Sequence, residues 1–177
     1  MIKTLGYAAK NSYSRLKRTE FEREEASTNE IEIEVLYCGV CHSDIHQVKN
    51  EWSNTVYPCV PGHEIVGRVT KVGPGGTRHA VGDLVGVGCM IESCRHCHPC
   101  QIGDQNYCEG PNSWLSTYTG PMVPAAKALN GGNMYGRDNT FGGYSDVILV
   151  NEDFALKIPK NLKPEVAAPI LCAGATT

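Results

Sequence analysis

The sequence has no apolar run approaching the roughly 18 residues that span a membrane, and its N-terminus lacks the apolar core of a signal peptide. It also lacks an excess of positive charge, because 16 Lys and Arg stand against 19 Asp and Glu. A nucleic-acid-binding protein normally carries a basic stripe. We therefore expect neither a membrane nor a nucleic-acid partner.

Aromatic residues are also scarce, at 7%, whereas glycine and proline together account for 29 of the 177 residues. This balance favours a turn-rich β protein over a helical bundle, and the length suits one domain of ordinary size. Alternating apolar residues predict a strand at 31–37. Further strands are expected at 63–72, 84–87, 143–150 and 154–158, weaker ones near Tyr7 and Leu16, and short helices at 41–50 and 164–168. The charged run 18–25 is expected to be a solvated turn or edge, and 110–142 a long loop.

Cysteine is abundant, with nine residues, but an odd number without an export signal argues against a disulfide framework. Four of them have the spacing C-x2-C-x2-C-x7-C, namely Cys94, Cys97, Cys100 and Cys108. Four thiolates so close in sequence can enclose one ion tetrahedrally, which predicts a structural zinc site in a lobe at 89–110. An iron–sulfur cluster is the competing interpretation, although its fourth cysteine normally comes sooner and precedes proline. His96 and His98 lie between the ligands and are interpreted as exposed loop residues.

A second candidate site is dispersed along the chain and consists of Cys41, His63, Glu64 and Cys172. Two sulfurs and one imidazole leave a zinc ion one ligand short, which is how a catalytic zinc is built. Taken alone, this spacing is weak evidence. Cys41 could instead pair with Cys38 in a C-x2-C redox motif, and Cys172 could be a buried structural thiol.

Several segments resemble the zinc-dependent medium-chain alcohol dehydrogenases, particularly the cinnamyl-alcohol-dehydrogenase-like group that includes bacterial NADP-dependent aldehyde reductases. The similar segments are Cys38–Asp44 (CGVCHSD), Pro61–Gly67 (PGHEIVG), Gly82–Gly88 (GDLVGVG), the four-cysteine segment and Leu171–Gly174 (LCAG). The resemblance extends over nearly the whole chain apart from 110–142, where the family has a shorter connection. This difference leaves the shape of the substrate pocket undetermined.

The resemblance implies a role for each candidate residue. Cys41, His63 and Cys172 would bind a catalytic zinc, Glu64 would approach that ion, and Asp44 would orient the ligating histidine. Ser43 would touch the substrate oxygen, His46 would end a proton relay, and His42 would face the cofactor pyrophosphate. Trp52 and Trp114 would line a substrate cleft or pack in the core. The implied fold is mainly β: a GroES-like, partly closed antiparallel barrel with few short helices and a zinc lobe.

The chain contains no G-x-G-x-x-G motif, which in this family lies in a Rossmann domain that follows the Cys172 segment. We therefore expect residues 1–177 to be a catalytic domain cut before the cofactor domain, with two zinc ions, and with NADP(H) bound only in the full-length protein. The expected substrate is a small alcohol or aldehyde, and the expected location is the cytoplasm. The alternative is a non-enzymatic zinc-binding GroES-like module, but the presence of Ser43, His46 and Glu64 favours an enzyme.

Overall fold

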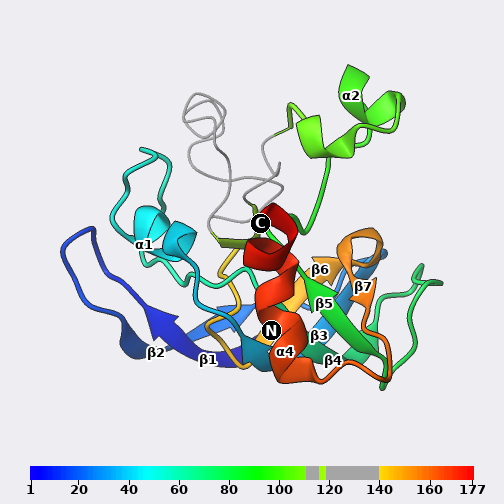
Figure 1. Cartoon of the computed structure of the whole chain (residues 1–177), viewed down its shortest axis with the longest axis horizontal. Coiled ribbons are helices and arrows are strands. Elements are labelled where there is room, and N and C mark those ends of the chain that lie inside the picture. Colours follow the sequence, from blue (N-terminus) through cyan, green and yellow to red (C-terminus); the bar gives the residue numbers. More distant parts are fainter. Residues whose placement is uncertain (111–115, 119–139) are drawn as a thin grey trace.

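The computed structural model describes residues 1–110, 116–118 and 140–177. Its strands form a two-stranded sheet in the order β1-β2 and a five-stranded sheet in the order β6-β3-β4-β5-β7 (Figure 1), and all the described pairings are antiparallel. The predicted mainly β, antiparallel fold is therefore confirmed. The strands are β1 (Ile2–Ala8), β2 (Lys17–Arg23), β3 (Glu30–Cys38), β4 (Ile65–Val72), β5 (Leu84–Val87), β6 (Val147–Asn151) and β7 (Leu156–Lys157).

The five-stranded sheet curls, because its two edge strands follow one another in sequence. β6 ends at Asn151 and β7 begins at Leu156, and a 3-10 helix, η3 (Glu152–Phe154), fills most of the gap. Five chain steps that include a 3-10 turn span less than the roughly 18 Å of an extended chain, whereas the edges of a flat five-stranded sheet lie about 19 Å apart. The sheet must therefore bend toward a barrel. Isolated bridges pair Gly6 of β1 with Ser145, just before β6, and Ala9 with Cys59 in the loop before β4.

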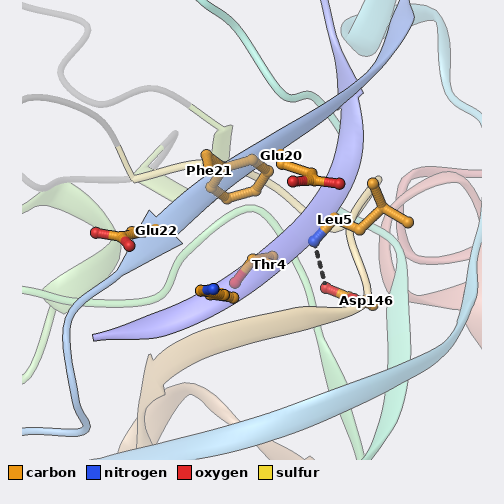
Figure 2. A pocket seen from close by; sticks show the side chains of 7 residues that line it. Thr4, Leu5, Glu20, Phe21, Glu22 and Asp146 are labelled. Carbon is orange, nitrogen blue, oxygen red and sulfur yellow. Dashed lines mark hydrogen bonds between the residues drawn. The ribbon is translucent and has the colours of Figure 1, made fainter.

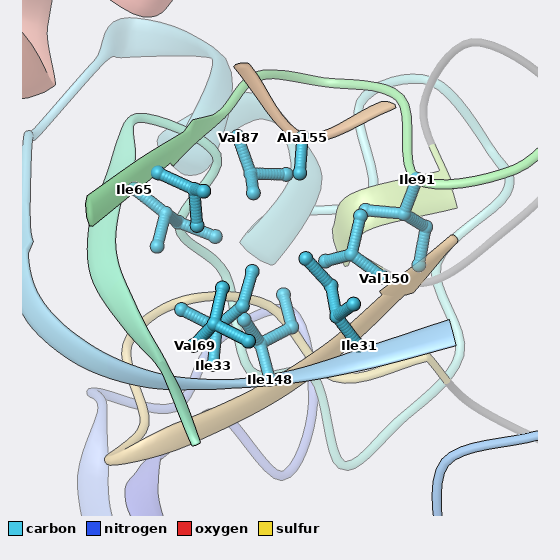
Figure 3. Close-up of a cluster of buried hydrophobic side chains, with 10 residues drawn as sticks. Ile31, Ile33, Ile65, Val69, Val87, Ile91, Ile148, Val150 and Ala155 are labelled. Atoms are coloured by element: carbon cyan, nitrogen blue, oxygen red, sulfur yellow. The ribbon is translucent and has the colours of Figure 1, made fainter. Parts of the chain in front are cut away.

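The hydrophobic core lies inside this curl and comes mainly from alternate residues of the central strands. Ile31 and Ile33 of β3 are fully buried, and they pack with Ile65 and Val69 of β4 and with Ile148 of β6 (Figure 3). The apolar alternation that predicts the strand at 31–37 is thus the inward face of β3. Full burial of each such side chain contributes about 1.5–3 kcal/mol to folding stability, so this cluster stabilises the strands that the neighbouring loops connect.

The helices are short and lie outside the strands. They are α1 (His42–Val48), α2 (His98–Gln101), α4 (Pro164–Pro169), the 3-10 helices η1 (Gln105–Tyr107) and η2 (Ser116–Tyr118), and the π-helix η4 (Ile170–Gly174). The helices predicted at 41–50 and 164–168 correspond to α1 and α4. Pro164 suits the first turn of α4, and Pro169 lacks the N–H that would continue the α-helical ladder. The chain continues past it as η4, which carries Cys172.

Most of the charged run 18–25 lies in β2, whose described pairing is with β1 alone, so of the two expected alternatives, a solvated turn or an edge, the edge is the one observed. Two other predictions of secondary structure need adjustment. The strand predicted at 143–150 begins only at Val147, because the backbone N–H groups of residues 142–144 donate hydrogen bonds to the carbonyls of the loop 60–62. The strand predicted at 154–158 is reduced to β7. The predicted loop 110–142 falls largely outside the described residues, as does Trp114.

In the part of the chain that the structure describes, none of the helices combines the length and the apolar character needed to cross a bilayer.

The lobe that contains α2 projects away from the body of the strands, whereas α1 and η4 lie closer to it (Figure 1). The α2 lobe and the region around α1 and η4 therefore differ in how closely they lie to the strands, and each contains one of the predicted cysteine clusters.

Candidate metal centres

The dispersed residues meet in space. The ligand atoms of Cys41, His63, Glu64 and Cys172, which we call the dispersed centre, all lie within 4.8 Å of one another. Cys41 precedes the first turn of α1, His63 and Glu64 precede β4, and Cys172 lies in η4. The structure thus brings together the four residues that the sequence analysis groups. Cys38 is not in this group, and burial raises its pKa to about 12, which does not suit a reactive C-x2-C pair.

The imidazole of His63 fits a metal site. Its side chain is fully buried, its Nδ1 lies 3.0 Å from Oδ1 of Asp44, and its Nε2 has no hydrogen-bond partner among the described residues. A buried polar atom without a partner costs about 1–3 kcal/mol. A cation between the neighbouring sulfurs would satisfy this nitrogen. The ring of Tyr118, from η2, meets the imidazole edge-on with the ring centroids 4.6 Å apart.

The carboxylate of Asp44 connects two of the candidate ligands. Besides His63, its Oδ1 accepts the backbone N–H of Gly62 at 2.8 Å, and its Oδ2 accepts the backbone N–H of Cys41 at 3.0 Å. The hydroxyl of Tyr144 donates to Oδ2 at 3.1 Å. Asp44 lies where the resemblance implies an orienting carboxylate. The sequence alone did not predict that Asp44 also accepts a hydrogen bond from Cys41, or that Tyr144 donates to Asp44.

Glu64 connects the centre to the end of the described chain. Its Oε1 accepts the backbone N–H of Ala173 at 2.9 Å, next to Cys172. A Cβ built on Gly39 would lie 2.2 Å from Oε2 of Glu64, so a glycine is needed to leave room for this carboxylate. The contact fixes η4 against the loop before β4, although residues 64 and 173 lie far apart in sequence.

The two thiols of the dispersed centre differ in acidity. Burial alone would raise the pKa of Cys41, but hydrogen bonds from the backbone and the hydroxyl of Ser43 outweigh it and lower that pKa. Burial raises the pKa of Cys172 to about 12, and the neighbouring Cys41 adds to this increase. Burial also opposes the charge of His63, yet the hydrogen bond to Asp44 raises its pKa. A bound cation would favour the thiolate form of both cysteines.

The candidate relay residues lie on α1 beside the dispersed centre. Ser43 contacts the sulfur of Cys41, and His46 lies three residues further along, on the same face of the helix. Nδ1 of His46 contacts a carboxylate oxygen of Glu51, and this contact lowers the pKa of Glu51. Sequence reasoning missed Glu51. The rings of His42 and Trp52 lie 4.8 and 5.4 Å, centroid to centroid, from that of His46.

The four-cysteine centre is formed by the second group, Cys94, Cys97, Cys100 and Cys108, whose ligand atoms also lie within 4.8 Å of one another. Among the described residues, neither His96 nor His98 belongs to it; both are exposed as expected, but His98 begins α2 and does not lie in a loop. Backbone N–H groups of Cys94 and Gly110 point at the sulfur of Cys108, at 3.2 and 3.3 Å. Backbone N–H groups of Glu109 and Cys100 lower the pKa of Cys97 to about 6.

Ion pairs attach this lobe to the body of the protein. Asp153 of η3 pairs with Arg95 of the lobe at 2.8 Å and with Arg78 at 2.8 Å. The amide of Asn151 donates to Glu92 at 3.2 Å. Polar side chains therefore hold the lobe at its base, together with Ile91, which is buried in the hydrophobic core of the strands.

A surface pocket lies elsewhere, between residues of β1 and β2 (Figure 2). It has a volume of about 410 Å³ and is lined in part by Thr4, Phe21 and Asp146, whose Oδ1 accepts the backbone N–H of Leu5. No residue of either cysteine centre lines it. This pocket is therefore separate from the chemistry that the two centres can support.

Comparison with known proteins agrees with the geometry. Residues 27–160 match the family model of the alcohol dehydrogenase GroES-like domain. The chain is 45% identical over 172 residues to a probable cinnamyl alcohol dehydrogenase 8A of Oryza sativa subsp. japonica, covering 97% of this chain and 44% of that protein. It is 46% identical over 179 residues to aldehyde reductase YahK of Escherichia coli (strain K12), covering 99% and 46%.

Solved structures extend the likeness to three dimensions. A cinnamyl alcohol dehydrogenase of Sorghum bicolor superposes with a TM-score of 0.85 at 40% identity, covering 99% of this chain and 46% of that one. The CAD of Helicobacter pylori, solved in complex with NADP(H), superposes with a TM-score of 0.81 at 33% identity, covering 98% and 46%. The chain thus spans a little under half the length of the relatives that it matches.

Proposed function

Because the chain belongs to the alcohol dehydrogenase GroES-like domain family, we propose that it is the zinc-binding catalytic part of an NADP(H)-dependent oxidoreductase that interconverts small primary alcohols and aldehydes. The observation that carries the proposal is the convergence of Cys41, His63 and Cys172, with Nε2 of His63 turned toward the sulfurs and without another partner in the described structure. Three such ligands suit a zinc ion that also accepts a substrate oxygen.

The residues around the dispersed centre suit an alcohol–aldehyde conversion. When bound, zinc polarises the substrate oxygen as a Lewis acid, and the nicotinamide exchanges a hydride with the substrate carbon. The hydroxyl of Ser43 lies beside Cys41 and would take the proton of the alcohol. His46, one helical turn away, would pass that proton toward solvent, and its partner Glu51 would stabilise the charged imidazole.

The four-cysteine centre is proposed to hold a second, structural zinc. Four thiolates fill a tetrahedral shell and leave no position for a substrate. The choice of NADP(H) follows the complex of the Helicobacter pylori relative, and the choice of an alcohol or aldehyde follows the names of the relatives. We propose a cytoplasmic location because all nine cysteines are free thiols in the structure, which suits a reducing compartment.

Substrate access to the dispersed centre can be tested without the cofactor. Cobalt(II) replaces zinc and reports changes of its ligands by absorption. We expect trifluoroethanol, an unreactive alcohol, to change the cobalt spectrum of the dispersed centre and to leave that of the four-cysteine centre unchanged. Cys172→Ser, which removes one ligand of the dispersed centre, is the control that assigns the signal.

The same measurements distinguish the alternative, a non-enzymatic zinc module. Two zinc ions per chain and a response to trifluoroethanol support the proposed enzyme, whereas one ion and no response support the module. The 177-residue chain has no G-x-G-x-x-G motif, so we expect it to bind zinc but not to oxidise NADPH in the presence of an aldehyde. Detectable turnover by the purified chain would contradict that expectation.

A further inference from the structure

Tyr144 reaches the dispersed centre through Asp44. Its hydroxyl donates to Oδ2 of Asp44 at 3.1 Å, with the carbonyl oxygen of Gly39 at 3.3 Å as a second acceptor. Oδ1 of the same carboxylate contacts Nδ1 of His63 at 3.0 Å. A single carboxylate thus separates the phenol from the imidazole.

The backbone of Tyr144 is fixed on the loop that leads into His63. Its N–H donates to the carbonyl of Pro61 at 2.9 Å, and its carbonyl accepts the N–H of Tyr7 at 2.8 Å. Gly62 has a φ of 103°, and a Cβ built there would lie 2.6 Å from the backbone nitrogen of Tyr144. The two segments therefore pack so closely that a side chain at residue 62 would separate them.

A buried arginine holds the segment that contains Tyr144. The guanidinium of Arg23, on β2, donates to the carbonyls of Thr140 and Gly142 at 2.8 and 3.3 Å and to the hydroxyl of Ser145 at 3.0 Å. These hydrogen bonds hold the backbone of this segment in place, and with it the phenol of Tyr144 beside Asp44. The hydroxyl therefore meets Asp44 from a fixed direction.

With Tyr144, Asp44 accepts four hydrogen bonds from the part of the chain that the structure describes. Two donors are the backbone N–H groups of Gly62 and Cys41, one is the imidazole of His63, and the fourth is the phenol. Two of these donors belong to candidate metal ligands, so the orientation of the carboxylate determines the position of both. Without the phenol, Oδ2 would be left with Cys41 alone, and the carboxylate plane could rotate.

We propose that Tyr144 is a positioning residue for the dispersed metal centre: it fixes the carboxylate of Asp44 and, through it, the direction of the His63 imidazole and the place of Cys41. This inference rests on the proposed zinc site and adds a residue to it. Burial, and then the charge of Asp44, raise the pKa of Tyr144, so the phenol keeps its proton and remains a donor.

The test is the rate at which the zinc-loaded chain gives up its metal to an excess of a chromophoric chelator. The four-cysteine centre is an internal reference, and Cys172→Ser identifies the phase that belongs to the dispersed centre. Partners of metal ligands typically contribute 10–100-fold to metal affinity. We expect Tyr144→Phe to speed the dispersed phase about tenfold, the lower end of this range, and to leave the reference phase unchanged.

The matched control is Tyr13→Phe, which removes a hydroxyl from a side chain that is 97% exposed. It should change neither phase. The cobalt(II) spectrum provides a readout that a general loss of stability would not move: Tyr144→Phe should alter the bands of the dispersed centre at a temperature where its circular dichroism is that of the wild type.

Each outcome bears on the inference. If the wild type releases two zinc ions and Tyr144→Phe changes the dispersed phase by less than twofold, Tyr144 has no positioning role, although the proposed function stands. If the wild type holds one ion and Cys172→Ser does not affect it, the proposed function fails and this inference with it.

If Tyr144→Phe does not fold, the unmutated chain labelled with 3-fluorotyrosine decides the question. Zinc should then shift the fluorine resonance of Tyr144 but not that of Tyr13, and an unshifted Tyr144 would overturn the proposal.

Discussion

The four-cysteine centre takes all its ligand atoms from residues 94–108, whereas the dispersed centre draws on the loop before β4, the start of α1 and the π-helix η4. The first has short backbone N–H···S contacts within its own lobe, which is attached to the body at its base by ion pairs and by Ile91. The second lies against the buried core, and the carboxylates of Asp44 and Glu64 join its segments, which are far apart in sequence. In the lobe the metal would organise the chain, whereas at the dispersed centre the chain organises the metal site.

The largest effects should come from removing one ligand at each centre. We expect Cys108→Ser to lose one zinc equivalent and to unfold the lobe locally, because binding energy is folding energy where a segment has little core of its own. Cys172→Ser should also lose one equivalent but keep the lobe and the strands folded. Metal analysis and hydrogen exchange of residues 94–108 measure the two results. Equal unfolding of the lobe in both variants would remove the distinction between the centres.

A smaller effect should follow when the ligands of the dispersed centre are kept and their support is changed. Asp44→Asn places an amide where the carboxylate accepts N–H groups from Cys41 and Gly62, so at least one of these bonds is lost. We expect zinc affinity at the dispersed centre to fall about 10–100-fold and that of the four-cysteine centre to stay constant. Competition with a chelator of known affinity measures both values in one sample.

The same contrast explains what could be read from the sequence. The four-cysteine centre is local, so its spacing alone predicted which four residues the structure brings together. Residues 41, 63 and 172 are joined by tertiary packing, and only the likeness of whole motifs to a family brought them together. Glu51 and Tyr144 were missed for different reasons. Glu51 looked like any exposed charge, and the strand predicted at 143–150 concealed that Tyr144 lies in a loop against Pro61.

The strands show the same limit. Period-two alternation identified β3 because one of its faces is buried in the core, and the Gly-Asp turn located β5. The strand predicted at 154–158 is shortened to β7, and at its start the side chain of Asn151 caps η3, so Phe154 lies in a 3-10 turn. A local hydrogen bond of this kind leaves no trace in an apolar pattern. Sequence periodicity therefore reports burial well and chain reversal poorly.

Acid sensitivity outside both centres can be tested at Glu152. Burial disfavours its charge, but the backbone N–H groups of Arg78 and Thr77 lower its pKa below the usual value. The resulting stabilisation is present above the unfolded-state pKa of about 4.3 and is lost as the pH falls through the lower folded-state value. We expect Glu152→Gln to lower the free energy of unfolding by about 1.5 kcal/mol at pH 7, and by less in acid. A constant difference across pH would contradict this explanation.

The smallest effect concerns the attachment of the lobe. Arg95 pairs with Asp153 at 2.8 Å, but its side chain is 40% exposed, and an exposed pair contributes only about 0.2–1 kcal/mol. Its backbone also has a φ of 63°, a left-handed conformation that costs a residue with a Cβ about 1 kcal/mol. Arg95→Ala should therefore lower the unfolding free energy slightly, whereas Arg95→Gly loses the same ion pair but relieves the strain, and should match or exceed the wild type. Zinc affinity of the four-cysteine centre should be the same in both variants. Because both variants lack the ion pair, an Arg95→Gly variant less stable than Arg95→Ala would show that the left-handed conformation of residue 95 does not destabilise the lobe, and would contradict this explanation.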